Sequence, residues 1–183
     1  GRVFDAANDP LMGFIVDRTR SKWGKMRPYL LYSPIPIAIT TILLFTAPDF
    51  QSMTAKVAYA AVTYILWGIA FTIQDVPFWG LSAVITPDEN ERTSFISTAR
   101  LGSTARGFLP PLILPILIAD NAFGLSTGFF IGAVIFAVLG AVLSSLAFFN
   151  TTERVEPVQK EKFTFKETVS LIIHNKVLLI VVA

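Results

Sequence analysis

Long stretches with few or no charged residues alternate with short stretches where charges crowd together. The apolar stretches are residues 29–47, 57–85, 94–118 and 127–149. A helix needs about 20 mainly apolar residues to cross the hydrocarbon core of a bilayer. Each of the four stretches meets this requirement, and the second is interrupted at Pro77. The pattern therefore predicts an all-α membrane protein with four full spans.

The composition excludes several classes of function. Charged residues make up only 15% of the chain, against about 25% in a typical soluble domain. The net charge of +2 is too small for a nucleic-acid-binding surface. The chain has no cysteine, and we find no Ser/His/Asp arrangement, histidine cluster or phosphate-binding glycine loop. We therefore expect no catalytic residues, no cofactor and no nucleic-acid partner, which disfavours a membrane enzyme.

Both ends of the chain read as parts of further spans. We expect an internal segment of a longer protein, in which residues 1–149 form a transmembrane bundle without its first span. The remaining parts are a cytoplasmic middle loop at 150–176 and the start of a second bundle at 177–183. In the loop, residues 163–174 place apolar side chains near one helical face, which predicts an amphipathic helix at the membrane surface. His174 is expected to have no chemical role.

The linkers predict the orientation in the membrane. Residues 17–28 and 150–176 are rich in lysine and arginine, and residues 86–93 carry one arginine among acidic residues. The alternate linkers, 48–56 and 119–126, hold one basic residue between them. Since basic loops stay in the cytoplasm, we expect a multi-pass protein of the plasma (inner) membrane with the first group of linkers inside.

Six charged residues nevertheless fall inside the proposed spans. Each costs about 2.5–3.5 kcal/mol at the centre of a membrane. Such residues face a water-filled cavity or pair with one another. One interpretation is a buried structural ion-pair network, because negative and positive charges are equal in number; the other is a path for a polar substrate. The residues are Arg2, Asp5, Asp9, Asp75, Arg100 and Arg106.

Two of the carboxylates lie one helical turn apart. Asp5, Asn8 and Asp9 have the spacing i, i+3 and i+4, which places them on one face of a helix. Two carboxylates in this position repel each other unless a cation or an arginine lies between them. Oxygen ligands suit a hard cation such as sodium, and a carboxylate alone can carry a proton. We therefore predict a cation site here.

A second cluster lies in the stretch 57–85. Thr72, Asp75 and Trp79 share a helical face near Pro77, which removes a backbone donor. A carboxylate can accept two hydroxyl hydrogens from a sugar, and an indole can stack on the sugar's apolar face. The cluster is consistent with polyol binding, although Trp79 alone would also suit an anchor at the membrane interface.

The first basic linker carries a loop signature. Gly13, Asp17 and Arg18 resemble the motif between the second and third spans of the major facilitator superfamily. In such a loop the Asp caps a helix end while nearby arginines bind neighbouring helix termini and acidic lipid. The alternative is a basic loop that only sets topology, and both interpretations can hold together.

Four stretches taken together resemble the glycoside–pentoside–hexuronide:cation symporters of that superfamily, in particular the melibiose-permease-like members. Their sequences are Phe4-Asp-Ala-Ala-Asn-Asp-Pro10, Asp17-Arg-Thr-Arg-Ser-Lys-Trp-Gly-Lys-Met-Arg-Pro28, Thr63-Tyr-Ile-Leu-Trp-Gly68 and Phe71-Thr-Ile-Gln-Asp-Val-Pro-Phe-Trp79. The match covers nearly the whole chain. It implies a partial major facilitator fold, from about the second span to the sixth with the start of the seventh.

The resemblance also implies roles for individual residues and partners. The cation site would comprise Asp5, Asp9, Asn8 and Thr72. The sugar would bind to Asp75, Trp79 and Arg100, with Asp9 bridging the two sites. The expected partners are a small sugar, a monovalent cation (sodium, or lithium or a proton) and the lipid bilayer. The function implied is cation-coupled sugar symport by alternating access.

One residue departs from the pattern of this family. Arg106 stands where a small apolar residue is expected, about 240° around the helix from Arg100. It is expected to pair with an acidic residue outside this chain or to extend to the membrane interface. Two alternatives to sugar symport stay open: a facilitator-superfamily carrier for another sugar, a lipid or a drug, and a non-transporting membrane scaffold. The residues Asp75 and Trp79 favour a galactoside-like substrate.

Overall fold

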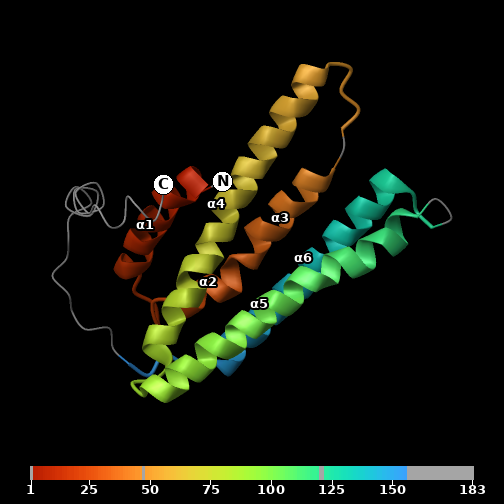
Figure 1. Cartoon of the computed structure of the whole chain (residues 1–183). Coiled ribbons are helices and arrows are strands. Elements are labelled where there is room, and N and C mark those ends of the chain that lie inside the picture. The colour runs from red at the N-terminus through yellow and green to blue at the C-terminus, as the bar shows by residue number, and fades with distance from the viewer. Residues whose placement is uncertain (1, 47, 120–121, 156–183) are drawn as a thin grey trace.

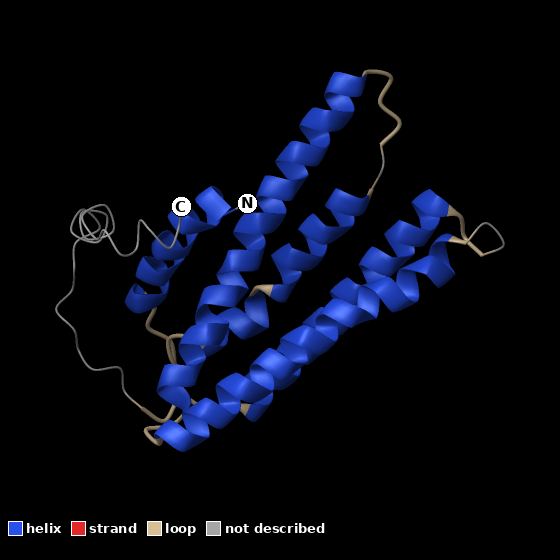
Figure 2. Ribbon diagram, in the orientation of Figure 1, coloured by secondary structure: helices blue, strands red, loops and turns tan. Residues whose placement is uncertain are grey.

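All the secondary structure in the described part of the chain is helical (Figure 2). The computed structural model describes residues 2–46, 48–119 and 122–155, with side chains from Asn8 onward. The helices are α1 (Arg2–Arg18), α2 (Arg27–Tyr32), α3 (Pro34–Phe45), α4 (Met53–Ile85), α5 (Glu89–Ile118) and α6 (Leu125–Asn150).

Four helical segments in these residues are long and apolar enough to cross a membrane. They are α2 with α3, then α4, α5 and α6, so the four predicted spans are confirmed. Large apolar side chains are exposed along them, among them Ile39, Leu112 and Phe149. Exposure of this kind on every span is what a lipid-facing surface requires, because lipid tails solvate apolar side chains.

The helices pack side by side in the order α1, α4, α3, α6, α5 (Figure 1). Helix α1 lies against α4, while α3 contacts both α4 and α6. Helix α5 packs mainly on α6 and has no buried residue, so it forms an edge of the bundle. The helices converge at the end where α2 lies and separate toward the other end (Figure 1).

The connections between helices alternate between the two ends of the bundle (Figure 1). The segments that link α1 to α2 and α4 to α5, and the residues after α6, lie at the end where the helices converge. The segments that link α3 to α4 and α5 to α6 lie at the opposite end. The basic linkers therefore share one end, as four antiparallel spans require, and the positive-inside rule predicts that this end, named the cytoplasmic end, faces the cytoplasm.

The first predicted span is divided into two helices, α2 and α3. The sequence analysis did not predict this division. Helix α2 ends at Tyr32 and α3 begins at Pro34, although Ser33 between them keeps a helical backbone with φ −65° and ψ −28°. Proline has no backbone N–H, so Pro34 and Pro36 cannot complete the α-helical hydrogen bonds across the join. The carbonyl of Leu30, four residues before Pro34, must find its donor elsewhere.

The other prolines do not divide their helices. Helix α4 continues through Pro77, which is buried, so the predicted interruption at this residue is wrong. Helix α1 likewise continues past Pro10. Inside a membrane, a break would expose several backbone polar groups to lipid, whereas a continuous helix loses only one hydrogen bond at each proline. The membrane therefore favours the intact helix.

The buried apolar core lies where the helices converge. It consists of Leu30 of α2, Leu81 and Val84 of α4, and Phe148 of α6. Partly buried residues, Trp23 among them, pack around this cluster, and the Trp23 ring meets the edge of Phe148 with centroids 5.7 Å apart. The strongest packing is thus at the cytoplasmic end of the bundle.

Several predictions lie outside the described residues. The middle loop beyond residue 155, the amphipathic helix at 163–174 with His174, and the start of a second bundle at 177–183 belong to this group. The end of the first predicted domain, at residue 149, falls within one residue of the end of α6 at Asn150.

Candidate functional site

Two of the residues predicted to bind sugar, Asp75 and Trp79, share a face of α4 with Thr72, while Arg100 lies on α5 and Asp9 on α1. Thr72 is buried, Asp75 is partly buried, and Trp79 is 36% exposed. The buried stripe of this helix that packs into the bundle contains Ala70, Pro77 and other residues, and it lies on a different side of the helix. Thr72 is buried on the same face as Asp75 and Trp79, so this face is open to a ligand only around the two later residues.

Asp75 has two partners among the described residues. The Trp79 side chain, one turn further along α4, donates a hydrogen bond to the carboxylate. The charge of Arg106 on α5 also acts on the carboxylate, although these two described residues form no ion pair or hydrogen bond with each other. Phe78 meets the Trp79 ring edge-on, with centroids 5.4 Å apart, and this contact restricts the indole. The arrangement is a carboxylate hydrogen-bonded to an indole, with the charge of an arginine on the next helix acting on it at longer range.

The two arginines of α5 therefore differ in an unexpected way. Arg106, which we expected to pair outside this chain or to extend to the interface, interacts with Asp75. Both arginines are exposed, and no hydrogen bond described for residues 2–46, 48–119 and 122–155 involves either guanidinium, so they differ only in that the charge of Arg106 acts on Asp75. A sugar contact by Arg100 stays a prediction.

Three of the residues predicted to bind a cation, Asp5, Asn8 and Asp9, lie on α1, and the fourth, Thr72, lies on α4. Met12 and Val16 are buried, and α1 packs on α4, so this face of α1 points toward α4. Positions 5, 8 and 9 continue the same face toward the start of the helix, at intervals of three and four residues. The face that would carry a cation therefore borders the helix that carries Thr72 and Asp75.

Asn8 is the best-defined member of the predicted cation site. Its side-chain nitrogen is buried and has no hydrogen-bond partner in the described residues. A buried donor without a partner costs about 1–3 kcal/mol. A hydroxyl or carboxylate oxygen could remove this cost, whereas a cation would bind the amide oxygen of Asn8 instead. Asp9 is exposed, and it already interacts with another residue of the chain. The described residues include no group of three His, Cys, Asp or Glu side chains that could hold a metal ion.

The predicted loop signature has a modest structural role in the described residues. Asp17 and Arg18 are exposed at the end of α1, and the Arg18 guanidinium lies 4.1 Å from the centre of the Phe14 ring. A Cβ added at Gly13 would meet nothing within 4 Å, so packing does not require glycine there. Arg27, at the start of α2, donates a hydrogen bond of 2.8 Å to the Phe148 carbonyl near the end of α6. Such a contact is of the kind expected of arginines near the signature, while the roles of Gly13, Asp17 and Arg18 themselves stay predictions.

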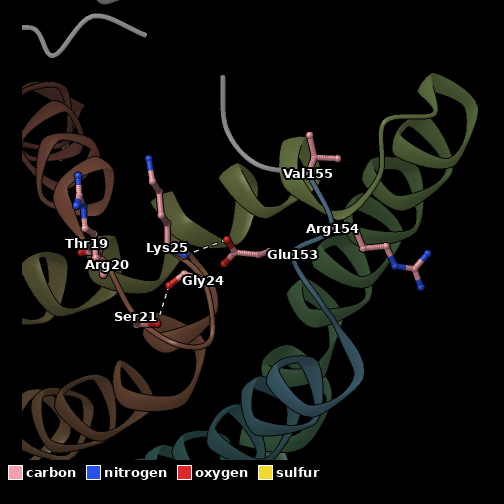
Figure 3. Close-up of a pocket in the computed structure, with 8 residues that line it drawn as sticks. All are labelled: Thr19, Arg20, Ser21, Gly24, Lys25, Glu153, Arg154 and Val155. Carbon is pink, nitrogen blue, oxygen red and sulfur yellow. Dashed lines mark hydrogen bonds between the residues drawn. The ribbon is translucent and has the colours of Figure 1, made fainter. Parts of the chain in front are cut away.

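Sequence reasoning missed a second group of residues around this loop. Glu153 follows α6 and accepts hydrogen bonds from the backbone N–H groups of residues 25–27. It lines a pocket of about 300 Å³ at the cytoplasmic end of the bundle. Figure 3 shows the Glu153 side chain directed at the linker between α1 and α2, with Lys25 and Gly24 beside it. The pocket is lined by Thr19, Arg20, Ser21, Gly24, Lys25, Glu153, Arg154 and Val155.

Sequence reasoning also missed a polar contact within the bundle. The Ser144 hydroxyl on α6 donates to the Leu30 carbonyl at 2.6 Å and accepts a hydrogen bond of 3.0 Å from the Gln74 amide. Gln74 is the residue next to Asp75. The proline at position 34, which leaves the Leu30 carbonyl without a helical donor, was the one signal in the sequence for this contact.

Membrane-length helices that carry a carboxylate hydrogen-bonded to an indole within a span are typical of a polytopic membrane transporter. The sequence matches the family described as MFS/sugar transport protein over residues 1–183. The chain belongs to this family, whose members are transporters rather than enzymes. Its helices accordingly form part of a major facilitator fold, in a multi-pass protein of the plasma membrane.

Curated relatives agree with this family. The chain is 41% identical over 158 residues to the putative glycoside/cation symporter YagG of Escherichia coli K12, covering 84% of the chain and 33% of that protein. It is 38% identical over 156 residues to the inner membrane symporter YicJ of the same organism, covering 85% of the chain and 34% of that protein. The isoprimeverose transporter of Lactiplantibacillus pentosus is 34% identical over 165 residues, covering 88% and 34% respectively. The chain spans about a third of the length of these relatives.

Proposed function

We propose that this chain forms most of the N-terminal bundle of a cation-coupled glycoside symporter that works by alternating access. The coupling cation is sodium, with lithium or a proton as the alternatives. The single observation that carries the proposal is the pair Asp75 and Trp79, a carboxylate and an indole one turn apart on the membrane helix α4, with the charge of Arg106 on α5 acting on the carboxylate.

The chemistry of this group suits a sugar. The Asp75 carboxylate can accept hydrogen bonds from two hydroxyls, and the exposed part of the Trp79 ring can stack on the apolar face of a pyranose. Arg106 can donate to further hydroxyls while its charge offsets that of Asp75. A lipid or a typical drug offers few hydroxyl groups, so a carboxylate in the membrane would gain little from binding it.

Coupling follows from the packing of α1 on α4. A cation held by Asp5, Asp9, Asn8 and Thr72 would cancel the repulsion between the two carboxylates and join the two helices. Because Asp75 lies three residues after Thr72 on α4, fixing this helix also fixes the sugar site. Each ligand would then raise the affinity for the other, as thermodynamic linkage requires.

The names of relatives support the substrate class. They include a putative glycoside/cation symporter, an isoprimeverose transporter and a glucuronide carrier protein homolog. Two lactose permeases of Lactobacillus species are more distant, at 24% and 28% identity. We assign a glycoside as the cargo, and a carrier for another solute is the alternative that the following experiment tests.

The experiment measures uptake of a labelled α-galactoside by vesicles that contain the complete transporter of which this segment is part. We expect a sodium gradient to stimulate uptake. Stimulation by a pH gradient alone would keep the fold and the sugar but change the cation. Absence of uptake of this and other glycosides under every gradient would refute glycoside transport and favour another solute.

Three variants assign the two sites. Asp9→Asn is expected to remove the response to sodium, whereas Asp75→Asn is expected to remove sugar binding itself. Asp49→Asn is the matched control, because Asp49 lies exposed in the segment between α3 and α4 at the opposite end of the bundle. Equal loss in all three variants would indicate general damage rather than two specific sites.

A further inference from the structure

The carboxylate of Glu153 makes the longest-range set of polar contacts at the cytoplasmic end. One oxygen accepts hydrogen bonds from the backbone N–H groups of Met26 at 2.7 Å and Arg27 at 2.9 Å. The other accepts from the N–H of Lys25 at 2.9 Å. These N–H groups precede or begin α2, where a helix leaves its first donors without partners. A carboxylate at this position is stabilised by both the hydrogen bonds and the helix dipole.

The backbone is shaped to receive this carboxylate. Gly24 has φ +103°, a conformation that other residues rarely adopt, and it turns the chain so that the three following N–H groups converge. A Cβ at Gly24 would collide with the carboxyl group of Glu153. Gly24 is therefore required twice, once for its φ angle and once for the space that the Glu153 side chain occupies.

The residues after Glu153 bind to a third helix. The backbone N–H groups of Arg154 and Val155 both donate to the Val84 carbonyl, at 2.9 and 3.0 Å. Val84 is next to the last residue of α4, so its carbonyl has no donor within the helix. The short segment 153–155 thus satisfies donors at the start of α2 and an acceptor at the end of α4. We call this set of contacts the Glu153 junction.

Side chains reinforce the same junction. The Arg27 guanidinium lies 4.8 Å from the centre of the Phe148 ring and also bonds the Phe148 carbonyl. Thr19 and Tyr29 share a hydrogen bond of 2.5 Å between their hydroxyl groups, which joins the end of α1 to α2. The junction therefore holds the cytoplasmic ends of α1, α2, α4 and α6 together, beside the apolar core around Phe148.

We propose that Glu153 is a positioning residue for transport, whose contacts with residues 25–27 make the cytoplasmic ends of these helices move as one rigid body. The inference rests on the proposed function. Alternating access requires one bundle to rock as a unit against another around the bound substrate. Helix α1 carries the predicted cation ligands and α4 the predicted sugar ligands, so a loose junction would let the two sites move apart during the transition.

The rigid body is tested by distance, independently of transport. Spin labels are attached at Arg20→Cys and Arg154→Cys in an otherwise cysteine-free complete transporter. Both side chains are exposed and lie on the two sides of the junction. We expect one narrow distance distribution, unchanged by sodium with an α-galactoside. Glu153→Ala is expected to broaden it, and a broad distribution in the parent protein or a narrow one in Glu153→Ala would overturn the proposal.

Transport kinetics separate positioning from binding. Glu153→Ala is expected to lower the maximal uptake rate about tenfold, comparable to the loss of one charge-assisted hydrogen bond, while the sugar KM stays within about twofold. Glu153→Gln keeps an acceptor for Met26 and Arg27 and is expected to give an intermediate rate, and it remains measurable should Glu153→Ala fail to fold. A raised KM at an unchanged maximal rate, or an unchanged rate despite broadened distances, would overturn the transport role.

A second variant disturbs the contact between Glu153 and residues 25–27 by changing the glycine that precedes these residues. Gly24→Ala is expected to displace the carboxylate and reproduce the slow rate, and combining it with Glu153→Ala is expected to add little. Gly124→Ala is the matched control, because Gly124 also has a positive φ, +74°, but a Cβ there meets nothing within 4 Å. Full additivity of the first two variants would contradict the proposal. If the parent protein transports no glycoside, the proposed function fails, while the label distances still test the junction.

Discussion

The hydroxyl of Ser144 donates to the carbonyl oxygen of Leu30 over 2.6 Å, across the interface between α6 and α2. This carbonyl needs a donor because Pro34, four residues later, has no N–H. Ser144 in turn accepts a hydrogen bond from Gln74 of α4 at 3.0 Å. The carbonyl that the proline leaves without a donor on α2 is therefore hydrogen-bonded by a side chain of α6, and that side chain is held in place by a hydrogen bond from α4.

The contact predicts a specific loss of stability in Ser144→Ala. The variant leaves the Leu30 carbonyl and the Gln74 amide without partners in a buried site. We expect the free energy of unfolding to fall by about 1–2 kcal/mol, above the average for hydrogen bonds between membrane helices, because no backbone donor can replace the hydroxyl. Unfolding in detergent micelles titrated with SDS measures the change. Ser145→Ala is the control, and an equal effect in both variants would refute the explanation.

The interface between α5 and α6 predicts a graded series of glycine variants. A Cβ at Gly128 would lie 2.5 Å from the Leu117 carbonyl oxygen, which is backbone and cannot move aside. A Cβ at Gly132 would meet the end of the Leu114 side chain, which can rotate, and one at Gly140 would meet nothing within 4 Å. We expect Gly128→Ala to destabilise the protein by about 1–3 kcal/mol and Gly132→Ala by less.

Gly140→Ala is the control in this series. It is expected to be neutral or slightly stabilising, because alanine favours a helix more than glycine does. The same SDS titration ranks the three variants. A large loss in Gly140→Ala would show that glycine is needed in α6 for a reason other than its contact with α5.

The spans could be predicted from the sequence because the membrane imposes a simple requirement on each helix. A run of apolar residues of sufficient length has no alternative to a helix in lipid, so α4 was predicted to within a few residues even though it contains Asp75. The start of α5 was missed by several residues. Asp88 and the acidic residues after it are a helix-start signal, but they were interpreted as a linker between spans.

Contacts between helices could not be predicted in the same way. Helical periodicity gives the angle between Arg100 and Arg106 but not which of them faces α4, because that depends on how α5 is rotated against its neighbours. Glu153 lies in a polar stretch of mixed charge, where its pattern is that of a solvated surface residue. Its role depends on the turn at Gly24, which is far away in sequence and close only in the fold.

The N-cap of α5 gives a prediction at the cytoplasmic end. The Asp88 carboxylate accepts hydrogen bonds from the N–H of Asn90 at 2.7 Å and of Glu91 at 3.2 Å. Asp88→Ala is expected to lower the free energy of unfolding by about 1 kcal/mol, whereas Asp88→Asn should keep most of it, since both Asp and Asn are good caps. Hydrogen exchange of the first turn of α5 localises the effect. Equal exchange in both variants would show that the cap is not what stabilises this turn.

The relation of Arg106 to Asp75 leads to a prediction that distinguishes the two arginines of α5. If Arg106 provides the charge that offsets Asp75, the two residues form one unit, and Arg106→Gln should weaken sugar binding much less in an Asp75→Asn background than in the parent protein. Residues in one such network commonly couple by about 0.5–3 kcal/mol. Arg100→Gln should show no such coupling to Asp75→Asn, because Arg106 and not Arg100 is the charge that acts on the Asp75 carboxylate.

Each of these comparisons is a double-mutant cycle, which needs the sugar affinity of the parent protein, of the two single variants and of the double variant. Protection of the complete transporter against thermal unfolding by the sugar measures these four affinities. Asp75→Asn is expected to reduce this protection strongly, so the thermal stability of the sugar-free protein serves as a second readout of the same cycle. An isolated arginine in the membrane is costly, and Asp75→Asn should therefore destabilise the sugar-free protein unless Arg106 is removed with it. The opposite result would be additive effects of Asp75→Asn and Arg106→Gln in both readouts, together with coupling between Asp75→Asn and Arg100→Gln. This result would assign the sugar-site arginine to position 100 and leave Arg106 without a role in the site.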